Sequence, residues 1–240
     1  MNYMGINVNI NKMTLIGSGA QADIYLYENK AFKIYKNNYM EDEARCEADL
    51  QKKAQRAGLP VPLVYDVTDV DGRCAIIMEY IQGKPVGEML LENMEKAYEY
   101  LSLSVDLQIE IHKIHANGFP SQISKLENKI DSAPYLTAEQ KQKLLTRLVK
   151  LPKDDKLCHG DFHILNIMQC SDGLKIIDWV DASSGSIIAD VCLYYTAKIS
   201  PKFILIFIAA KQISISKASL NGCRFLPAQG YVKMSLKMML

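Results

Sequence analysis

The chain has 240 residues, 49% of them apolar, and a net charge of +1. This length and composition favour one compact globular protein, or two small lobes that share a cleft, and exclude a fibrous or disordered chain. The longest apolar run, residues 203–210, is too short to cross a bilayer, and residues 1–13 lack the pattern of a secretory signal. Six cysteines scattered without Cys-x-x-Cys spacing indicate reduced thiols, so we expect a cytoplasmic protein without a membrane partner.

The first predicted element is a glycine-rich turn between two strands, within residues 16–24. Glycines at positions 17 and 19 leave backbone amides open to phosphate oxygens, because they place no side chain in the way. Ala22 stands where a third glycine would complete the pattern. An ordinary hairpin also uses a Gly-x-Gly sequence, so this turn alone does not define a site.

A strand and a helix are predicted next. Residues 31–35 form an apolar run with Lys33 at its centre, which indicates a strand with one basic side chain. Residues 40–57 are rich in charge and contain no glycine or proline, which predicts a helix. Gly58 is a suitable C-terminal cap for this helix, and the Leu-Pro-Val-Pro sequence that follows prevents its continuation.

Two further elements precede the most informative motif. Residues 75–81 form an apolar strand that ends in a polar step. Residues 98–117 show helical spacing of apolar side chains at Leu101, Val105, Ile109 and Ile114. His112 and His115 lie three positions apart on this helix, but no third ligand is near them in the sequence, so we expect no metal there.

The segment that carries chemistry is His159-Gly160-Asp161, with Asn166 five residues after the aspartate. A predicted hairpin with a Ser-Asp-Gly turn follows, and Asp178 comes directly after it in Ile-Asp-Trp. An aspartate, an asparagine and a second aspartate in this order are typical of phosphoryl transfer. The first accepts the proton of the substrate hydroxyl, and the other two hold magnesium against the nucleotide phosphates. The alternative is a simple turn that connects core strands.

In this order the motifs resemble the aminoglycoside phosphotransferase-like kinases, a family that also holds choline, fructosamine and homoserine kinases. His-Gly-Asp, then His163, Asn166 and Ile-Asp-Trp follow that family's pattern rather than the His-Arg-Asp and Asp-Phe-Gly of protein kinases. The resemblance extends over about residues 14–195. It implies an α+β, two-lobe, protein-kinase-like fold: a small antiparallel β-sheet lobe with one helix over residues 1–80, and a mainly helical lobe over residues 81–240.

The resemblance also implies the roles of the site residues in the second lobe. Asp161 would be the catalytic base, and Asn166 and Asp178 would be the ligands of Mg²⁺. His159 and His163 would orient the catalytic loop through hydrogen bonds. Asp190 resembles an aspartate of the family that supports this loop from a following helix, so its predicted role is structural.

The nucleotide, ATP or GTP, would be bound mainly by the first lobe, through Gly17, Ser18, Gly19, Ala31, Lys33, Glu47, Met78, Glu79 and Ile81. Lys33 would contact the phosphates, with Ala31 in the position of the alanine of Val-Ala-Ile-Lys. Glu47 would pair with Lys33, and Glu43, one turn earlier, is the alternative. Met78 would precede the hinge, where backbone groups near Glu79 and Ile81 would contact the adenine edge.

The C-terminal part has an unusual charge. From residue 191 onward there are seven basic residues and no acidic one, whereas the first 190 residues hold 21 basic and 27 acidic residues, a net charge of −6. The family ends in an acidic helical segment, and the resemblance of this chain is lost after about Ala218. A neighbouring reading frame can encode an acidic, helix-favouring tail, so we suspect a frameshift near Leu220 and expect a poorly packed tail. A basic tail that binds nucleic acid fits less well.

The resemblance implies transfer of the γ-phosphoryl group of ATP or GTP to a hydroxyl of a small molecule: an aminoglycoside, amino sugar, sugar or amino alcohol. The mildly acidic body is compatible with a polycationic substrate but does not require one. The first alternative is a nucleotide-binding protein whose altered C-terminus weakens catalysis. A second is a protein kinase, against which the missing arginine in His-Gly-Asp and the missing Ala-Pro-Glu segment both argue. The sequence does not indicate an oligomeric state.

Overall fold

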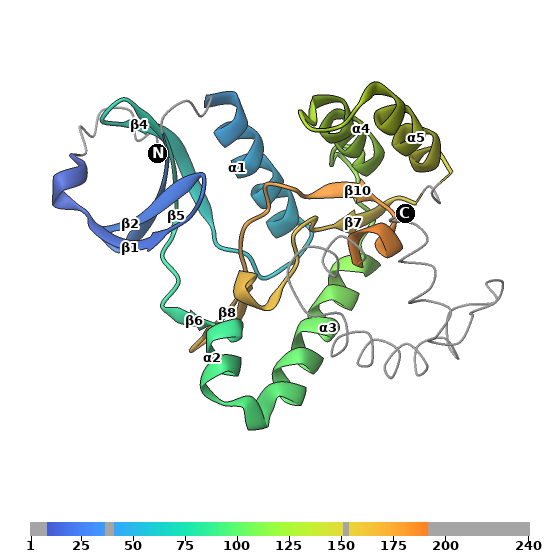
Figure 1. Ribbon diagram of the computed structural model, residues 1–240. Coiled ribbons are helices and arrows are strands. Elements are labelled where there is room, and N and C mark those ends of the chain that lie inside the picture. Colours follow the sequence, from blue (N-terminus) through green and yellow to red (C-terminus); the bar gives the residue numbers. More distant parts are fainter. Residues whose placement is uncertain (1–8, 37–40, 151–153, 192–240) are drawn as a thin grey trace.

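The computed structural model of the chain describes residues 9–36, 41–150 and 154–191, arranged as two lobes (Figure 1). The first lobe is a five-stranded antiparallel sheet in the order β1-β2-β3-β5-β4. Its strands are β1 (Thr14–Ser18), β2 (Ala22–Tyr27), β3 (Lys30–Tyr35), β4 (Val64–Val70) and β5 (Arg73–Glu79). One α-helix, α1 (Glu41–Arg56), joins β3 to β4, and a short 3₁₀ turn, η1 (Ile10–Lys12), precedes β1. The predicted small antiparallel lobe with one helix is therefore confirmed.

The two faces of this sheet pack against different partners. Ile24, Lys33 and Ile76 are cross-strand partners, so their side chains emerge on the same face. Small residues of α1 pack on this face, in a cluster of Ala22, Tyr35, Ala44, Ala48 and Ile76. The opposite face buries Phe32, Ile34, Val70, Ala75 and Ile77, against which Ile10, Met13, Tyr25 and Tyr27 pack. The side chain of Lys33 therefore lies on the side of the sheet that α1 covers.

Helix α1 ends as its sequence predicts. Its first turn is acidic and its last turn contains Lys53 and Arg56, an arrangement that complements the helix dipole. Gly58 adopts a left-handed φ of +86°, and its amide donates to the carbonyl of Gln55 at 2.9 Å. A residue with a Cβ is strained in this conformation, which explains why a glycine ends the helix.

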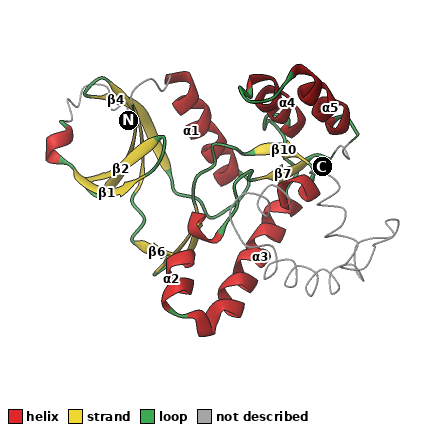
Figure 2. Ribbon diagram, in the orientation of Figure 1, coloured by secondary structure: helices red, strands yellow, loops and turns green. Residues whose placement is uncertain are grey.

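The second lobe is mainly helical (Figure 2). Its helices are α2 (Val86–Glu92), α3 (Ala97–Lys113), α4 (Gln122–Ser132) and α5 (Ala138–Leu148), with the 3₁₀ turns η2 (Met94–Lys96) and η3 (Ile164–Asn166). Its short strands are β6 (Gly83–Pro85), β7 (Lys156–Cys158), β8 (Ile167–Cys170), β9 (Gly173–Ile176) and β10 (Ser183–Gly185). They pair as a three-stranded sheet, β6-β8-β9, and a two-stranded ribbon, β10-β7. The predicted hairpin after the catalytic segment is thus formed by β8 and β9.

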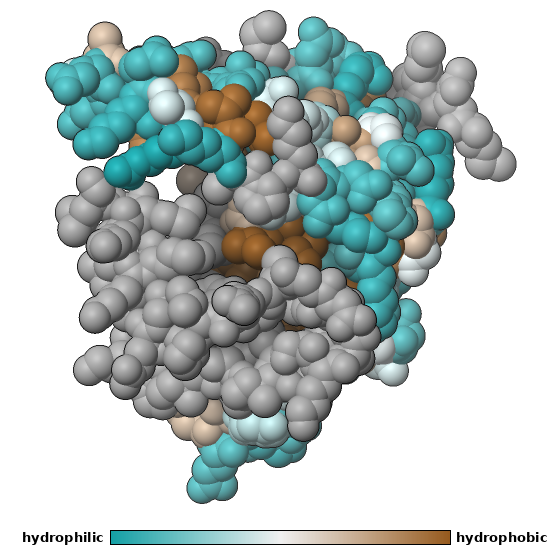
Figure 3. Space-filling view, turned by 90° about the vertical axis from the view of Figure 1, so that its right-hand side faces the viewer, coloured by the Kyte–Doolittle hydropathy of each residue, from teal (hydrophilic) through white to brown (hydrophobic). Residues whose placement is uncertain are grey.

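Helices α4 and α5 form an antiparallel pair at one end of the second lobe (Figure 1). Ser121 caps α4 by accepting from the amide of Ser124, and Thr137 and Gln140 form a capping box at the start of α5. The surface at this upper end of the molecule is mainly hydrophilic (Figure 3). This helical pair therefore presents polar side chains outward and packs its other side against the rest of the lobe.

The core of the second lobe lies beneath the catalytic segment. Leu157, Ile167, Ile176 and Trp179 have no exposed surface. Trp179 also donates from Nε1 to the carbonyl of Ile176 at 3.0 Å, so its polar atom is satisfied inside the core. The strands that lead into and out of the catalytic segment are therefore anchored by buried side chains.

The side of α3 that faces this core differs from the prediction. The predicted stripe of Leu101, Val105 and Ile109 is only half-buried, and Ile114 is the C-cap of a helix that ends at Lys113 rather than Asn117. The side chains that pack into the core are Leu103, Leu107, Ile111 and Ile114. Apolar residues occupy every second position from 101 to 111, so they lie on several sides of a helix and their spacing does not select one.

Some predictions concern parts of the chain that the structure leaves undescribed. The tail from about residue 220, its suspected frameshift and its predicted poor packing all lie outside the described residues. The predicted lobe boundary between residues 80 and 81 falls in the connection from β5 to β6 and stays a prediction. Among the described residues, no helix combines the length and apolar content that crossing a bilayer requires.

Candidate functional site

The catalytic segment begins with a glycine in a conformation that few other residues adopt. Gly160 follows β7 and has a φ of +84°. A Cβ on this residue would lie 2.5 Å from the carbonyl oxygen of Asp181, which is closer than any real contact. The amide of Gly160 donates to Oδ1 of Asp190 at 2.8 Å. The turn before Asp161 therefore requires glycine for two reasons, its dihedral angle and the close approach of a neighbouring backbone.

His159 connects the two strands of chain that carry the predicted acidic residues. Its Nε2 donates to the carbonyl of Ile177 at 3.1 Å, and its Nδ1 accepts from the amide of Asp161 at 3.3 Å. The ring is completely buried and lies 4.6 Å from the ring of Trp179, centroid to centroid. Burial lowers the pKa of His159, which keeps it in the neutral form that these two hydrogen bonds require. The predicted orienting role of His159 agrees with this geometry.

Asn166 is held directly against the catalytic segment. Its Nδ2 donates to the backbone carbonyl of Asp161 at 2.9 Å, and its own carbonyl accepts from the amide of Ile177 at 3.0 Å. These bonds place Asn166 between Asp161 and the residue that precedes Asp178. The carboxylate of Asp161 is 34% exposed, and its Oδ2 lies 3.5 Å from Nε2 of His163. The segment thus turns a carboxylate toward solvent while its backbone is fixed from three sides.

Asp178 has a backbone conformation that is rare for a residue other than glycine, with a φ of +66°. Aspartate tolerates this region better than most residues, and such strain is concentrated at functional sites. Its side chain is 39% exposed, and Oδ1 lies 3.4 Å from Nζ of Lys33. The turn after β9 therefore brings a carboxylate of the second lobe to the central lysine of the first.

Lys33 pairs with Glu47 as predicted. Nζ of Lys33 lies 2.5 Å from Oε1 of Glu47, which is buried on α1, whereas the alternative residue Glu43 is exposed. Burial acts to lower the pKa of Lys33, but the carboxylates of Glu47 and Asp178 outweigh this effect and the pKa is raised. The lysine is therefore a permanent cation between two carboxylates.

The residues predicted to surround the nucleotide base lie on or next to the sheet face that carries Lys33. Ala31 and Met78 are cross-strand partners, and cross-strand pairing places them on the same face as Lys33. Glu79 ends β5 and Ile81 follows it. The amide of Glu79 donates to the carbonyl of Leu63 at 2.8 Å, so a contact of Glu79 with a nucleotide base would use its carbonyl.

The carboxylate of Glu79 has partners in both lobes. Its Oε2 accepts from the amide of Leu63 at 3.0 Å, and its Oε1 lies 3.3 Å from Nζ of Lys175 on β9. Lys175 and Glu79 are 20% and 26% exposed, respectively. This ion pair joins the end of the first lobe's sheet to the hairpin beneath it.

The glycine-rich turn closes on itself. The hydroxyl of Ser18 donates to Oδ1 of Asp23 at 2.6 Å, a bond that lowers the pKa of this carboxyl, and the amide of Gly19 donates to the carbonyl of Ala22 at 2.9 Å. Lys36 donates to the carbonyl of Gly19 at 2.6 Å. Contacts from Ser18 or Gly19 to phosphate would require exchange of these bonds, so their predicted role stays a prediction.

The two histidines predicted on one helix, His112 of α3 and His115 just beyond the end of α3, have carboxylate partners. His112 lies 2.9 Å from Oδ2 of Asp190, and His115 lies 2.8 Å from Oδ2 of Asp155. The first pair is nearly buried and the second is exposed. His112 therefore supports Asp190, which in turn holds the catalytic segment.

Three contributors were missed by the sequence predictions: Tyr35, His112 in its contact with Asp190, and Lys175. The hydroxyl of Tyr35 donates to Oε2 of Glu47. Its position two residues after Lys33 on a predicted strand is the one signal that could have shown this contact. His112 and Lys175 contact residues 78 and 96 positions away, and no local pattern reports such pairs.

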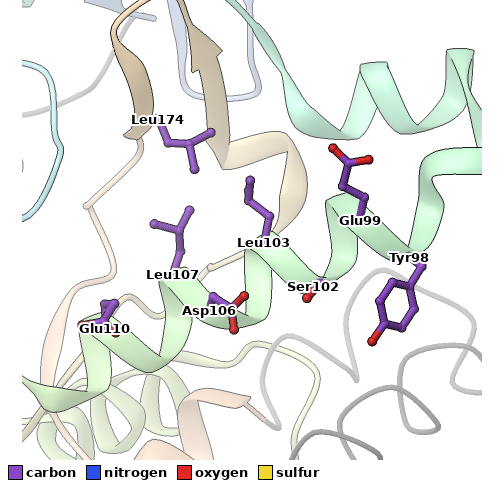
Figure 4. A pocket seen from close by; sticks show the side chains of 8 residues that line it. All are labelled: Tyr98, Glu99, Ser102, Leu103, Asp106, Leu107, Glu110 and Leu174. Carbon is purple, nitrogen blue, oxygen red and sulfur yellow. The ribbon is translucent and has the colours of Figure 1, made fainter.

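A separate groove lies along α3 (Figure 4). Its volume is about 570 Å³, and it is lined by Tyr98, Glu99, Ser102, Leu103, Asp106, Leu107, Glu110 and Leu174. None of the predicted site residues lines it. The chemistry is therefore assigned to the residues between the sheet face of Lys33 and the catalytic segment rather than to this groove.

The fold and the site together define a kinase-like phosphotransferase: a lysine–glutamate pair in a β-lobe faces an aspartate-bearing loop and a second aspartate in a helical lobe. The chain matches the family described as APH, Phosphotransferase enzyme family, over residues 12–223, and it belongs to that family. The resemblance on which the sequence predictions rest is confirmed, and so is the class of small-molecule kinase.

One curated relative is the EKC/KEOPS complex subunit BUD32 of Enterocytozoon bieneusi (strain H348), which is 32% identical over 177 residues, covering 70% of each chain. The fold resembles that of an aminoglycoside-3'-phosphotransferase of type VIII, with a TM-score of 0.63 and 16% identity over 95% of this chain and 94% of that one. It also resembles a thermostable mutant of aminoglycoside phosphotransferase APH(4)-Ia in a ternary complex with AMP-PNP and hygromycin B. That TM-score is 0.61, at 12% identity over 87% and 80% of the two chains. At these identities the two solved structures support the fold alone.

Proposed function

We propose that the chain transfers the γ-phosphoryl group of ATP to a hydroxyl group of a small molecule. The observation that carries this proposal is the position of Lys33: its Nζ lies 2.5 Å from Glu47 of the same lobe and 3.4 Å from Asp178 of the other lobe. In kinases a lysine–glutamate ion pair and a magnesium-binding aspartate must both be in place, and here the buried Glu47 and the partly exposed Asp178 both lie next to Lys33.

Each residue has a distinct part in the proposed reaction. Lys33 contacts the phosphates of the nucleotide, and Glu47 keeps it in place. Asp161, on a loop fixed by Gly160 and Asn166, orients the acceptor hydroxyl and accepts its proton as the oxygen attacks the γ-phosphorus. The backbone of Glu79 and Ile81 contacts the base beneath Met78 and Ala31.

Asn166 and Asp178 are suited to hold Mg²⁺. Both offer oxygen atoms, and the hydrogen bond between the amide of Ile177 and the carbonyl of Asn166 keeps the two residues on adjoining backbone. Magnesium in kinase sites takes only one or two protein ligands and completes its shell with phosphate oxygens and water, so two donors are sufficient. The bound ion would neutralise charge on the phosphates during transfer.

The acceptor is a small hydroxyl compound, such as an aminoglycoside, amino sugar, sugar or amino alcohol. Because a neighbour of the same fold was solved with hygromycin B and AMP-PNP, an aminoglycoside is the first compound to test. Free thiols at Cys46, Cys74, Cys158 and Cys170 support a cytoplasmic location, since reduced cysteines are typical of that compartment.

A phosphorylation screen of the purified chain with Mg·ATP and these four classes of compound tests the proposal. Asp161→Asn should retain nucleotide binding and lose about 10²–10⁴-fold in transfer, the usual contribution of a general base. Asp178→Ala should remove the magnesium-dependent thermal shift caused by ATP. Equal turnover by Asp161→Asn and the wild type would exclude Asp161 as the base. Nucleotide binding without transfer to any acceptor would favour the alternative of a nucleotide-binding protein.

A second candidate function follows from the relative of 32% identity, which is a subunit of the EKC/KEOPS complex. In this alternative the chain acts within a protein assembly rather than on a free metabolite. Radiolabelled ATP distinguishes the two candidates: label in small-molecule products supports the first, and label that appears only in protein supports the second.

A further inference from the structure

Tyr35 contacts the Lys33–Glu47 pair from inside the first lobe. Its hydroxyl donates to Oε2 of Glu47, while Lys33 bonds to the other oxygen, Oε1, at 2.5 Å. Tyr35 and Glu47 are only 1% and 3% exposed. Because water has little access to this carboxylate, each of its oxygens depends on its own protein donor.

The position of Tyr35 is fixed by the strand and by its packing. It lies two residues after Lys33 on β3, so both side chains emerge on the face of the sheet that α1 covers. Nζ of Lys33 lies 5.6 Å from the centre of the Tyr35 ring, a distance typical of a cation–π contact. Ala22, Ala44, Ala48 and Ile76 pack in the same cluster as this ring. The hydroxyl of Tyr35 therefore has a defined place relative to both Lys33 and α1.

Two donors on separate oxygens fix a carboxylate more completely than one donor does. The terminal torsion of a glutamate is broad, so a single hydrogen bond leaves the carboxylate plane free to rotate. In this chain the lysine and the tyrosine come from the same strand, and Glu47 comes from α1. Removing the tyrosine hydroxyl would release one of the two bonds from β3 to this carboxylate of α1, and with it the orientation of the lysine.

We propose that Tyr35 is a positioning residue of the phosphotransferase site. By holding the second oxygen of Glu47, it keeps α1 against β3 and keeps Lys33 in the place where it meets the nucleotide phosphates. The contact with phosphates rests on the proposed function, whereas the effect on Lys33 does not. Two measurements separate these effects: chemical labelling of Lys33 without nucleotide reports the effect on the lysine, and nucleotide binding reports the contact with phosphates.

Chemical labelling of Lys33 in the full chain without nucleotide tests the effect on the lysine. Tyr35→Phe keeps the ring and removes only the hydroxyl, and Tyr25→Phe, on the opposite face of the same sheet, is the matched control. Acetic anhydride modification followed by peptide mass spectrometry should show Lys33 reacting about three to ten times faster in Tyr35→Phe, because an ammonium group held less firmly by Glu47 loses its proton and meets the reagent more readily. This factor is that of one ordinary net hydrogen bond. Equal rates in the wild type and both variants would overturn the proposal.

A double-mutant cycle on Mg·ATP binding tests the route of the effect. Tyr35→Phe should raise the Kd about tenfold, whereas it should change the Kd little in a Glu47→Ala background, which removes both carboxylate oxygens, because Tyr35 acts through Glu47. Full additivity of the two substitutions would contradict this route. A mere loss of stability would not produce this non-additivity. Thermal unfolding of each variant is the control that checks that it is folded.

The two proposals fail in different ways. If the wild type does not bind Mg·ATP, the proposed function is wrong, while faster labelling of Lys33 in Tyr35→Phe still supports the positioning role. If the wild type binds and transfers but Tyr35→Phe matches Tyr25→Phe in both labelling and Kd, the site is confirmed and the role of Tyr35 is rejected.

Discussion

The carboxylate of Asp190 has one partner on each oxygen: Oδ1 accepts a hydrogen bond from the amide of Gly160 at 2.8 Å, and Oδ2 lies 2.9 Å from Nε2 of His112. Its residue is 2% exposed, so these two partners replace water almost completely. Through this carboxylate the helix that begins after Ser186 connects α3 to the catalytic segment. A buried carboxylate with two partners is costly to disturb, because the remaining groups lose their partners inside the protein.

The first prediction concerns this connection. Asp190→Asn places an amide where two acceptor oxygens are needed, so one contact is lost. We expect a loss of about 1–3 kcal/mol in the free energy of unfolding and a marked loss of phosphoryl transfer. Asp155→Asn is the matched control, since Asp155 also pairs with a histidine, His115 just beyond α3, at 2.8 Å, but on the exposed surface. Urea unfolding and a transfer assay measure both effects. Similar behaviour of the two variants would show that Asp190 does not support the segment.

Gly160 gives a second prediction. Gly160→Ala adds a Cβ 2.5 Å from the carbonyl of Asp181 in a residue with a φ of +84°. Gly118→Ala is the matched control, since Gly118 has a φ of +80° and no neighbour within 4 Å. The control should cost about 1–2 kcal/mol, the strain of a left-handed residue with a Cβ. Gly160→Ala should cost more and should also impair transfer. If the two variants are equally stable and equally active, the backbone of Asp181 yields to the new side chain.

The catalytic segment could be predicted from the sequence because its contacts are local. His159, Asp161, Asn166 and Asp178 lie within 20 positions, and a single hairpin brings the last of them back to the first. The Asp-Gly turn, the apolar strands and the polar residues between them are all visible in the sequence. The pairing of Lys33 with Glu47 was also predictable, since a lysine at the centre of a predicted strand and a glutamate on the predicted helix after it follow in the order that the family uses.

The supporting contacts could not be predicted because they join distant parts of the chain. His112 and Asp190 are 78 positions apart, and Glu79 and Lys175 are 96 apart. Their meeting depends on which side of α3 faces the core, and alternating apolar residues leave that side undetermined. The closed form of the glycine-rich turn could not be predicted either, since it depends on a hydrogen bond to Asp23, and no sequence motif marks Asp23 as a partner of this turn.

The ion pair between the lobes leads to a third prediction. Lys175→Met removes the contact of β9 with Glu79, which lies at the predicted hinge. Since both side chains are partly exposed, stability should change by less than about 1 kcal/mol. The Kd for Mg·ATP should rise, because the end of β5, at the proposed nucleotide site, is no longer tied to the β8–β9 hairpin. Lys84→Met, which removes a more exposed pair with Glu92 within the second lobe, is the control. Isothermal titration calorimetry measures the difference, and equal Kd values for both variants would contradict it.

The last prediction concerns pH. Burial lowers the pKa of His159, so below about pH 6.5 the unfolded chain binds a proton that the folded chain does not. The free energy of unfolding should therefore be unaffected by this residue above that pH and should fall as the pH decreases below it. One proton of difference gives a slope of up to about 1.4 kcal/mol per pH unit, which levels off once the folded state also binds the proton.

His159→Asn removes this proton-binding group, so its acid slope should be smaller than that of the wild type by up to one proton. His115→Asn, which removes an exposed histidine just beyond the end of α3, is the matched control. Urea unfolding between about pH 5 and pH 8 gives the slopes, and the comparison does not depend on the lower absolute stability that a core substitution produces. An unchanged slope in His159→Asn would mean that the fold does not keep the histidine neutral, and that its Nδ1 is not held as the acceptor of the Asp161 amide.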